Sequence, residues 1–415
     1  MNLSVSPHGL RQITPSSSQE RLVLMVTILV TCLAAHLGAQ ASAASSGLIN
    51  SSDIVYARGT GKVYAVDTAN GSVSIILPAG RVKVVKTGPG PISVAVNNRT
   101  RMAYVANAGS ESVSVIDGVA DKVIATVPTA ARPYAIAVDE LTDKVYVSNT
   151  FSNKLNVIDG KTNLASDIQA GSADAILVDS EEGRVYLLGY ESDKLTVLDT
   201  KTNAVTKLPA GALHLWSAIK TRDTLYVTHV QDATVAAINL DTQAIHEIHT
   251  GSMPDALVED RSTGEVCVAN YQDGSVSIID ERSATVLTTV KTPGHPQALA
   301  VDVEKGLLYA ANTRESTVSI IDLHELRVMK TINAGSHPYA IAVDTGTHKV
   351  YAANMGGTPF TLLSLPQSCS RTFSLVRTPA IARMRTVNKA DRSTPGQPEL
   401  KCVAKYSKPT SQEMK

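Results

Sequence analysis

The histidines of this 415-residue sequence are side chains that could bind a metal ion. His295 and His337 each precede a proline and lie 42 residues apart. Imidazole nitrogens, together with a carboxylate such as Asp174 or Asp255, are ligands for zinc or copper. A divalent metal site is therefore one hypothesis for this chain.

A second pair, His214 and His229, lies earlier in the sequence. None of the histidines has the short-range ligand spacing of a His-x-His or His-Glu-x-x-His motif. A His-Pro dipeptide is also tolerated in ordinary loops. We favour this structural interpretation and keep metal binding as the alternative, with no other cofactor predicted.

Motifs for nucleophilic catalysis are missing from the sequence. It has no Gly-x-Ser-x-Gly elbow, no glycine loop that would cradle a phosphate and no Cys-His pair with local support. A hydrolase built from scattered His, Asp, Glu and Arg residues would leave no linear motif. Arg132 and His337 would be the first residues to test for such an activity.

A repeat of about 40 residues must position these side chains. A four-residue segment such as residues 104–107 (YVAN) recurs along the chain, and the successive copies start 42, 40, 40, 41, 42 and 42 residues apart. The copies begin at Tyr104, Tyr146, Tyr186, Tyr226, Cys267, Tyr309 and Tyr351. The copies from 170 to 249 depart most from the pattern. Such a period is typical of repeat architectures.

Each copy contains four short runs rich in Val, Ile, Ala and Tyr, separated by Asp, Asn, Gly, Ser and Thr. This pattern predicts a four-stranded antiparallel meander. Because both faces of the strands are apolar, neighbouring copies must stack face to face, and a closed ring removes the exposed ends. The sequence thus predicts an all-β fold with a single β-propeller of four-stranded antiparallel blades.

Partial copies at both ends bear on the number of blades. Residues 53–77 resemble the last three strands of a blade, and residues 338–365 supply two clear strands and a doubtful third. We therefore prefer seven blades, with the two termini sharing one blade. Eight blades is the alternative, if each end completes its own.

The motifs are similar to those of the YVTN family of β-propeller repeats. Residues 133–139 (PYAIAVD), 144–149 (KVYVSN) and 113–117 (VSVID) carry this resemblance, which covers residues 88–354. It implies a propeller, but not one function, because such proteins include surface-layer, surface-binding and periplasmic proteins. The repeated Asn, Asp and Pro residues have structural explanations as turn residues.

In a propeller, the connections between blades and the turns from second to third strands open around the mouth of the central channel, where functional residues gather. A proline begins segments such as residues 133–139 (PYAIAVD), and we call it the repeat proline. The residues on either side of it are predicted to lie at the mouth of the channel. The candidate ligand-binding residues are Arg132, Asp174, His214, His229, Asp255, His295 and His337. No catalytic residue is assigned.

The N-terminus resembles an export signal. Arg11 and Arg21 precede an apolar run over residues 22–37, and residues 41–43 (ASA) offer the small side chains of a cleavage site. We predict a signal peptide over residues 1–43 and a secreted, periplasmic or cell-surface protein. An uncleaved membrane anchor is the alternative.

Charge separates the predicted propeller, residues 44–369, from a basic and flexible tail, residues 370–415. The tail carries ten Lys or Arg against three Asp or Glu, whereas the propeller has a net charge of −8. An acidic body disfavours nucleic acid as a partner, and the tail could contact an anionic surface. Cys369 and Cys402 could form a disulfide. Cys267 is predicted to be a buried residue that packs as a small hydrophobic side chain.

The expected function is a non-catalytic extracytoplasmic binding or scaffold module for a protein, glycan or small ligand. Short and nearly uniform loops favour this interpretation, because they leave no insertion for a lid. The alternative is a propeller enzyme, such as a lactonase-like hydrolase, or a metal-binding protein with its site at the channel mouth.

Overall fold

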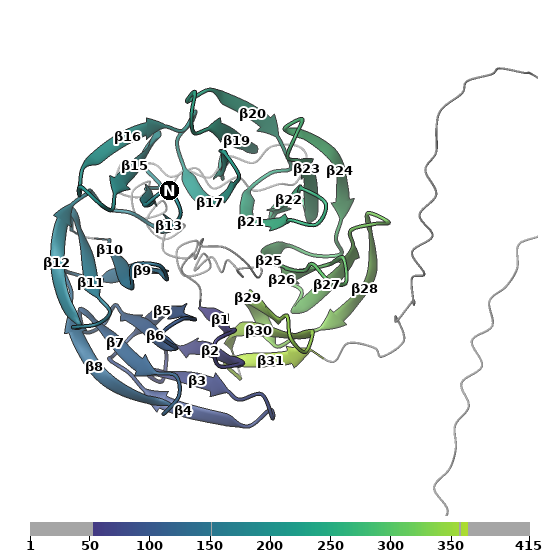
Figure 1. The fold of residues 1–415 in the computed structure, drawn as a ribbon. Helices are drawn as coiled ribbons and strands as arrows, with labels where there is room; N and C mark the ends of the chain where they lie inside the picture. Colours follow the sequence, from purple (N-terminus) through teal and green to yellow (C-terminus); the bar gives the residue numbers. More distant parts are fainter. Residues whose placement is uncertain (1–52, 151, 357, 364–415) are drawn as a thin grey trace, which may run out of the picture. The chain divides into compact units, whose positions relative to one another are not determined.

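The computed structural model describes residues 53–150, 152–356 and 358–363. Over these residues the chain consists of strands and turns, and eight antiparallel sheets follow one another in chain order around a ring (Figure 1). Within the described part no helix has the length and apolar character needed to cross a membrane. The predicted all-β propeller is confirmed.

In each sheet the strands pair in chain order, from the centre of the ring outward (Figure 1). The first strands are β1 (Ile54–Ala57), β5 (Pro91–Asn97), β9 (Pro133–Asp139), β13 (Ala175–Asp179), β17 (Leu215–Thr221), β21 (Pro254–Asp260), β25 (Pro296–Asp302) and β29 (Ser336–Asp344). The second strands are β2 (Lys62–Asp67), β6 (Met102–Asn107), β10 (Lys144–Asn149), β14 (Arg184–Leu188), β18 (Thr224–His229), β22 (Glu265–Asn270), β26 (Leu307–Asn312) and β30 (Lys349–Gly356).

The outer half of each sheet follows the same order. The third strands are β3 (Ser72–Ile76), β7 (Ser112–Asp117), β11 (Lys154–Asp159), β15 (Lys194–Asp199), β19 (Thr234–Asn239), β23 (Ser275–Asp280), β27 (Thr317–Asp322) and β31 (Phe360–Leu363). The fourth strands are β4 (Val82–Lys86), β8 (Lys122–Pro128), β12 (Leu164–Gln169), β16 (Val205–Pro209), β20 (Ile245–His249), β24 (Thr285–Lys291) and β28 (Arg327–Asn333).

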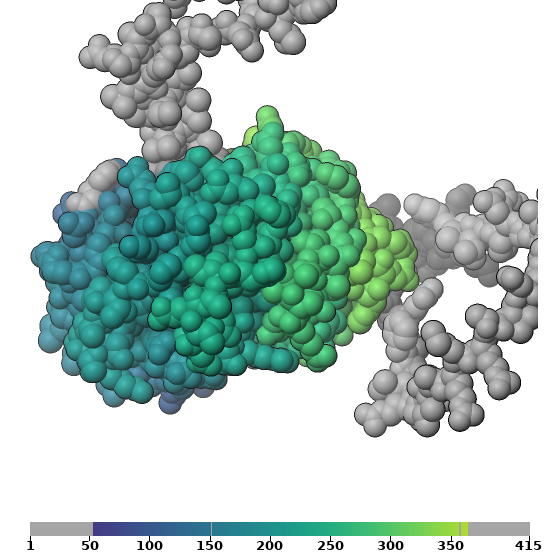
Figure 2. Space-filling view, turned by 90° about the horizontal axis from the view of Figure 1, so that it is seen from above, coloured from purple at the N-terminus to yellow at the C-terminus, as the bar shows by residue number. Residues whose placement is uncertain are grey.

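Burial falls from the centre of the ring to its rim. First and second strands are buried on both faces, whereas β8 and β24 alternate between exposed and partly buried residues. The repeated tyrosines of the second strands, such as Tyr104 and Tyr309, are fully buried between blades. Small and β-branched residues dominate because stacked sheets must approach closely on both faces. Figure 2 shows the blades abutting in chain order along the side of the ring.

Aspartates close the turns after the third strands, as their position in the repeat predicts. Asp117 Oδ1 accepts hydrogen bonds from the backbone N–H groups of Val119 (2.8 Å) and Ala120 (3.0 Å). These backbone hydrogen bonds hold the pKa of Asp117 below its ordinary value. The repeated asparagines end the second strands and bond to the third strand, since Asn107 Nδ2 donates to Ser112 Oγ at 3.2 Å and to Ser114 Oγ at 3.0 Å.

The preference for seven blades and the prediction of a shared blade are wrong. Residues 53–86 form a complete four-stranded sheet, β1–β4, and β29–β31 form a separate three-stranded sheet within the described residues. The strand that the sequence reading missed is β4, which pairs with β3. Its sequence, VKVVK, is largely exposed, since an outer strand needs hydrogen bonding on one edge and little apolar surface.

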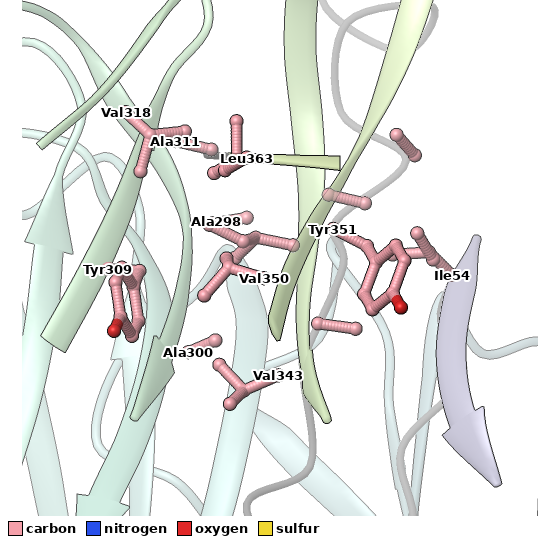
Figure 3. Close-up of a cluster of buried hydrophobic side chains, with 14 of the residues drawn as sticks. Ile54, Ala298, Ala300, Tyr309, Ala311, Val318, Val343, Val350, Tyr351 and Leu363 are labelled. Atoms are coloured by element: carbon pink, nitrogen blue, oxygen red, sulfur yellow. The ribbon is translucent and has the colours of Figure 1, made fainter. Parts of the chain in front are cut away.

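Side-chain packing, rather than a shared sheet, closes the ring. Ile54 of β1 and Tyr351 of β30 belong to one buried cluster that also contains Tyr309 and Leu363. Figure 3 shows the ring of Tyr351 between β30 and the strand that carries Ile54. The first and last blades thus meet in the same way as any other two neighbours.

Candidate binding face

One face of the ring combines two kinds of loop, and we call it the mouth face. It consists of the connections between blades and the turns between second and third strands. The backbone N–H of Ala108, in such a turn, donates to the carbonyl of Gly90 in a connection (2.8 Å), and Thr313 donates to His295 in the same way (3.0 Å). Arg132 and His295, which precede the repeat proline, therefore lie on this face.

Three residues that precede the repeat proline adopt a left-handed backbone. Arg132, Met253 and His337 have φ values of 51°, 54° and 53°, close to the 61° of Gly90 at the equivalent position. This conformation is costly for residues with a Cβ atom. The exposed Arg132 side chain is thus held at the mouth face by a backbone that favours glycine.

His295 pairs with Glu315 in the next turn of its own blade. Its Nδ1 lies 2.7 Å from Glu315 Oε1, and its backbone N–H donates to Oε2 at 2.8 Å. Burial alone would raise the pKa of Glu315, but these hydrogen bonds and the imidazole charge outweigh it and hold the pKa below its ordinary value. The pair fixes the orientation of the ring.

His337 has different partners and does not share a site with His295. Its Nδ1 lies 2.9 Å from Ser336 Oγ, and its backbone N–H donates to Ser316 Oγ at 3.2 Å. Among the described residues, no group of three or more His, Cys, Asp or Glu side chains is arranged to hold a metal ion. The metal hypothesis gains no support from this geometry.

His229 is a core residue. It is fully buried, with Nδ1 3.0 Å from Thr234 Oγ1 and Nε2 2.9 Å from the carbonyl oxygen of Ala210. Because that carbonyl can only accept, Nε2 carries the proton and Nδ1 accepts from the threonine hydroxyl. Desolvation lowers the pKa of His229, against the opposing hydrogen bond to Ala210. Both nitrogens are therefore occupied in the neutral form.

His214 belongs to an aromatic cluster that the sequence reading missed. The ring of Tyr190 lies 4.9 Å from that of His214 and 6.2 Å from that of Trp216, at an interplanar angle of 89° to the indole. The Tyr190 hydroxyl lies 2.5 Å from Nε2 of Gln231. Trp216 is the one tryptophan of the sequence, a signal that could have pointed here.

Asp174 connects this cluster to the neighbouring blade. Its Oδ2 accepts a hydrogen bond from the backbone N–H of Tyr190 at 2.8 Å. Burial raises the pKa of Asp174, and its charge in turn raises the pKa of Tyr134 on β9, although desolvation is the larger cause there. Asp174, Tyr190 and Tyr134 are thus close enough to share one electrostatic environment.

Two more carboxylates are buried, Asp255 in β21 and Asp53 directly before β1. Asp255, predicted from the sequence, is 1% exposed, and Asp53, which the sequence reading missed, is 3% exposed. Burial raises the pKa of Asp53 well above its ordinary range. The Asp53 charge also contributes to the raised pKa values of Tyr134 and Tyr339.

Ion pairs between blades lie on the opposite face. Lys62 Nζ is 2.6 Å from Asp121 Oδ1, and Lys220 Nζ is 2.8 Å from Asp179 Oδ2. Each pair joins adjacent blades, near the turns between first and second strands or between third and fourth strands. These charges have structural partners, so the opposite face is a poorer candidate for ligand binding.

Comparison with known proteins identifies the family. The sequence matches the family model of the YNCE-like beta-propeller over residues 23–350, most of the chain. The protein belongs to the YNCE-like β-propeller family. This agrees with the YVTN resemblance, and no curated protein sequence matches it.

Solved structures show the same fold as this YNCE-like propeller at low sequence identity. Dihydro-heme d1 dehydrogenase NirN in complex with DHE is 16% identical, with a TM-score of 0.62, covering 72% of this chain and 69% of that one. The computationally designed Ika8 protein is 13% identical, with a TM-score of 0.59, covering 76% and 96%. These likenesses establish the fold of the YNCE-like chain alone.

Cys267 of the YNCE-like protein is a buried free thiol, as predicted, and burial raises its pKa. The predicted signal peptide, the Cys369–Cys402 disulfide and the basic tail lie outside the described residues. The predicted site residues therefore divide into mouth-face residues with exposed atoms, such as Arg132 and His295, and core residues, such as His229.

Proposed function

We propose that this YNCE-like propeller is a non-catalytic binding protein that takes its ligand on the mouth face. The supporting observation is the distribution of aromatic residues. Seven tyrosines fill the buried repeat position of the second strands. Tyr190 and Tyr271 lie in second-to-third-strand turns of the mouth face, and Trp216, the single tryptophan, lies near the start of β17 and contacts Tyr190. Tyr134 and Tyr339 pack against buried clusters close by in the first strands.

Such residues are suited to recognition. Tyrosine and tryptophan supply large contact areas at low conformational cost, and they combine an apolar body with a polar group. In a chain with 4% aromatic residues, their presence at one face is not required by the repeat, which has Ala108 or Thr150 where Tyr190 stands. The rigid ring of blades would hold the face in place.

Trp216 provides the test. Its fluorescence in the full-length protein reports on the mouth face, because the sequence has no other tryptophan. A panel of small molecules and oligosaccharides is expected to contain a ligand that shifts the emission and raises the thermal midpoint. Tyr190→Ala should abolish both effects. Leu141→Ala, an exposed apolar residue between first and second strands on the opposite face, is the matched control.

Two results would contradict the proposal. One is a panel in which no compound changes Trp216 emission or thermal stability. The other is turnover of a panel of lactones that falls on Arg132→Ala or His337→Ala, because that would make the protein a hydrolase.

We further propose that the protein acts outside the cytoplasm, supported by the charge and apolar pattern of residues 1–43. Expression of the full chain in a bacterial host, followed by fractionation and N-terminal sequencing, should give an exported form that begins at Ala44. Retention of residue 1 in the cytoplasmic fraction would refute this.

A further inference from the structure

The loops of three consecutive blades give the mouth face an acidic sector. We call residues 170–174, 190–193, 210–214, 230–233, 250–255 and 271–274 the acidic sector. These loops carry six carboxylates and no Lys or Arg. The carboxylates are Asp174, Glu191, Asp193, Asp232, Asp255 and Asp273. Two lysines adjoin these loops: Lys194 begins β15, and Lys291 at the end of β24 donates from Nζ to the carbonyl oxygen of Asp273 at 3.1 Å.

The aromatic cluster lies in this same sector. Tyr190 and Trp216 are in edge contact, with ring centroids 6.2 Å apart and ring planes at 89°. Tyr271, at the position equivalent to Tyr190 in the second blade along, lies 5.4 Å from His295 between ring centroids. Aromatic ring faces carry negative electrostatic potential, and a cation placed over such a face is attracted to it.

Polar groups of the cluster are partly removed from water. Asp174 Oδ2 accepts the backbone N–H of Tyr190 at 2.8 Å. His214 Nδ1 is buried and lacks a hydrogen-bond partner within the described part of the chain. A carboxylate removed from water without a cation is destabilised, as the raised pKa of Asp174 reflects. A cationic ligand would relieve this cost.

We propose that the ligand of the mouth face is an organic ammonium ion, held between the rings of Tyr190 and Trp216 and the carboxylate of Asp174. This inference rests on the proposed binding function and names its ligand class. Anions are disfavoured because the acidic sector carries six carboxylates and no Lys or Arg. A neutral sugar could stack on the same rings, but the charge of the sector would contribute nothing to its binding.

The experiment uses full-length protein and compares choline with its neutral carbon isostere, 3,3-dimethylbutan-1-ol. Trp216 emission and calorimetric titration give the two affinities. Choline should bind at least about tenfold more tightly, the ratio expected when a cation–aromatic attraction and one partly desolvated carboxylate act together. Spermidine tests ammonium groups with N–H donors, and binding of either cation over the isostere supports the proposal.

Variants separate the contributions. Tyr190→Leu keeps an apolar side chain but removes the ring, and should weaken choline binding about tenfold. Asp174→Asn should weaken it by a similar factor, whereas Tyr190→Phe, which keeps the ring, should bind as the parent does. Leu141→Ala on the opposite face is the control. Thermal midpoints of all variants show that they are folded.

Failure of this inference can be distinguished from failure of the binding function. If the isostere or a neutral oligosaccharide binds as tightly as choline, or if Asp174→Asn leaves choline affinity unchanged, the ligand is not an ammonium ion, although the mouth face still binds. If no compound of any class changes Trp216 emission or thermal stability, both proposals are wrong.

Discussion

His229 allows the clearest test of how the repeat tolerates a substitution. Three other blades have asparagine at this position with a pair of hydroxyls in the third strand. Asn312 Nδ2, for example, donates to Thr317 Oγ1 at 3.0 Å and to Ser319 Oγ at 2.8 Å. In the His229 blade the first hydroxyl is kept as Thr234, but the second position is an alanine, Ala236.

The imidazole makes two different hydrogen bonds in place of those of the asparagine amide. Its Nδ1 accepts from Thr234 Oγ1 and its Nε2 donates to the Ala210 carbonyl (2.9 Å), in the space beside Gly211 and Ala236. His229→Ala would remove both hydrogen bonds and leave the Ala210 carbonyl and a cavity behind. A buried group without a partner costs about 1–3 kcal/mol, so we expect a loss of about 3 kcal/mol in unfolding free energy.

Restoring the repeat residues should recover part of that loss. His229→Asn alone finds one hydroxyl, Thr234, and should cost about 1–2 kcal/mol. Adding Ala236→Ser supplies the second hydroxyl and should return about 1 kcal/mol. The same Ala236→Ser change in the parent crowds the imidazole and should destabilise it by about 1–2 kcal/mol. The two positions are therefore expected to be coupled.

Lowering the pH should destabilise the folded protein through His229. Because the pKa of His229 is lowered in the folded protein, the unfolded chain binds the proton more tightly. The stabilisation is fully present above the unfolded pKa of about 6.5 and is lost as the pH falls below it. His229→Asn should remove this part of the pH dependence.

Urea unfolding of the parent, both single variants and the double variant, followed by far-ultraviolet circular dichroism at pH 8 and pH 5.5, measures all these quantities. If Ala236→Ser changes the unfolding free energy equally in the parent and in the His229→Asn variant, the imidazole does not replace the hydrogen bonds of the repeat asparagine. If His229→Asn keeps the full acid sensitivity, another group causes it.

Three further predictions concern single buried groups. Asp53→Asn should raise the unfolding free energy at pH 8 and change it little near pH 3.5. The reason is that the pKa of Asp53 is raised in the folded protein, so the cost of burying this carboxyl exists only when it is ionised. An equal effect in urea titrations at both pH values would contradict this. Tyr309→Phe should change stability by less than about 1 kcal/mol, since the buried hydroxyl has no partner among the described residues, whereas Tyr309→Ala should cost about 3–5 kcal/mol; a large loss in the phenylalanine variant would show that the hydroxyl is bonded. Cys267 should react with a maleimide about 100-fold more slowly in the native protein than in urea, as its buried thiol has a raised pKa; peptide mapping by mass spectrometry follows the residue, and fast native labelling would place it near solvent.

The sequence by itself determined the repeat, the strand order within a blade and the closed stacking. Apolar residues on both faces of strands that recur about every 40 residues leave no other arrangement that buries them. Single residues such as Cys267 could also be placed in the core, because they occupy a repeat position whose environment the other copies define.

Tertiary structure alone decided how the ring closes and which mouth residues meet. β4 is held by pairing on one edge, so its exposed sequence VKVVK gave no apolar signal, and the blade count depended on it. Contacts between blades have no linear signature. Tyr190, His214 and Trp216 come together because a second-to-third-strand turn of one blade meets the connection to the next blade. Only the fold separates the buried His229 from His295 on the mouth face.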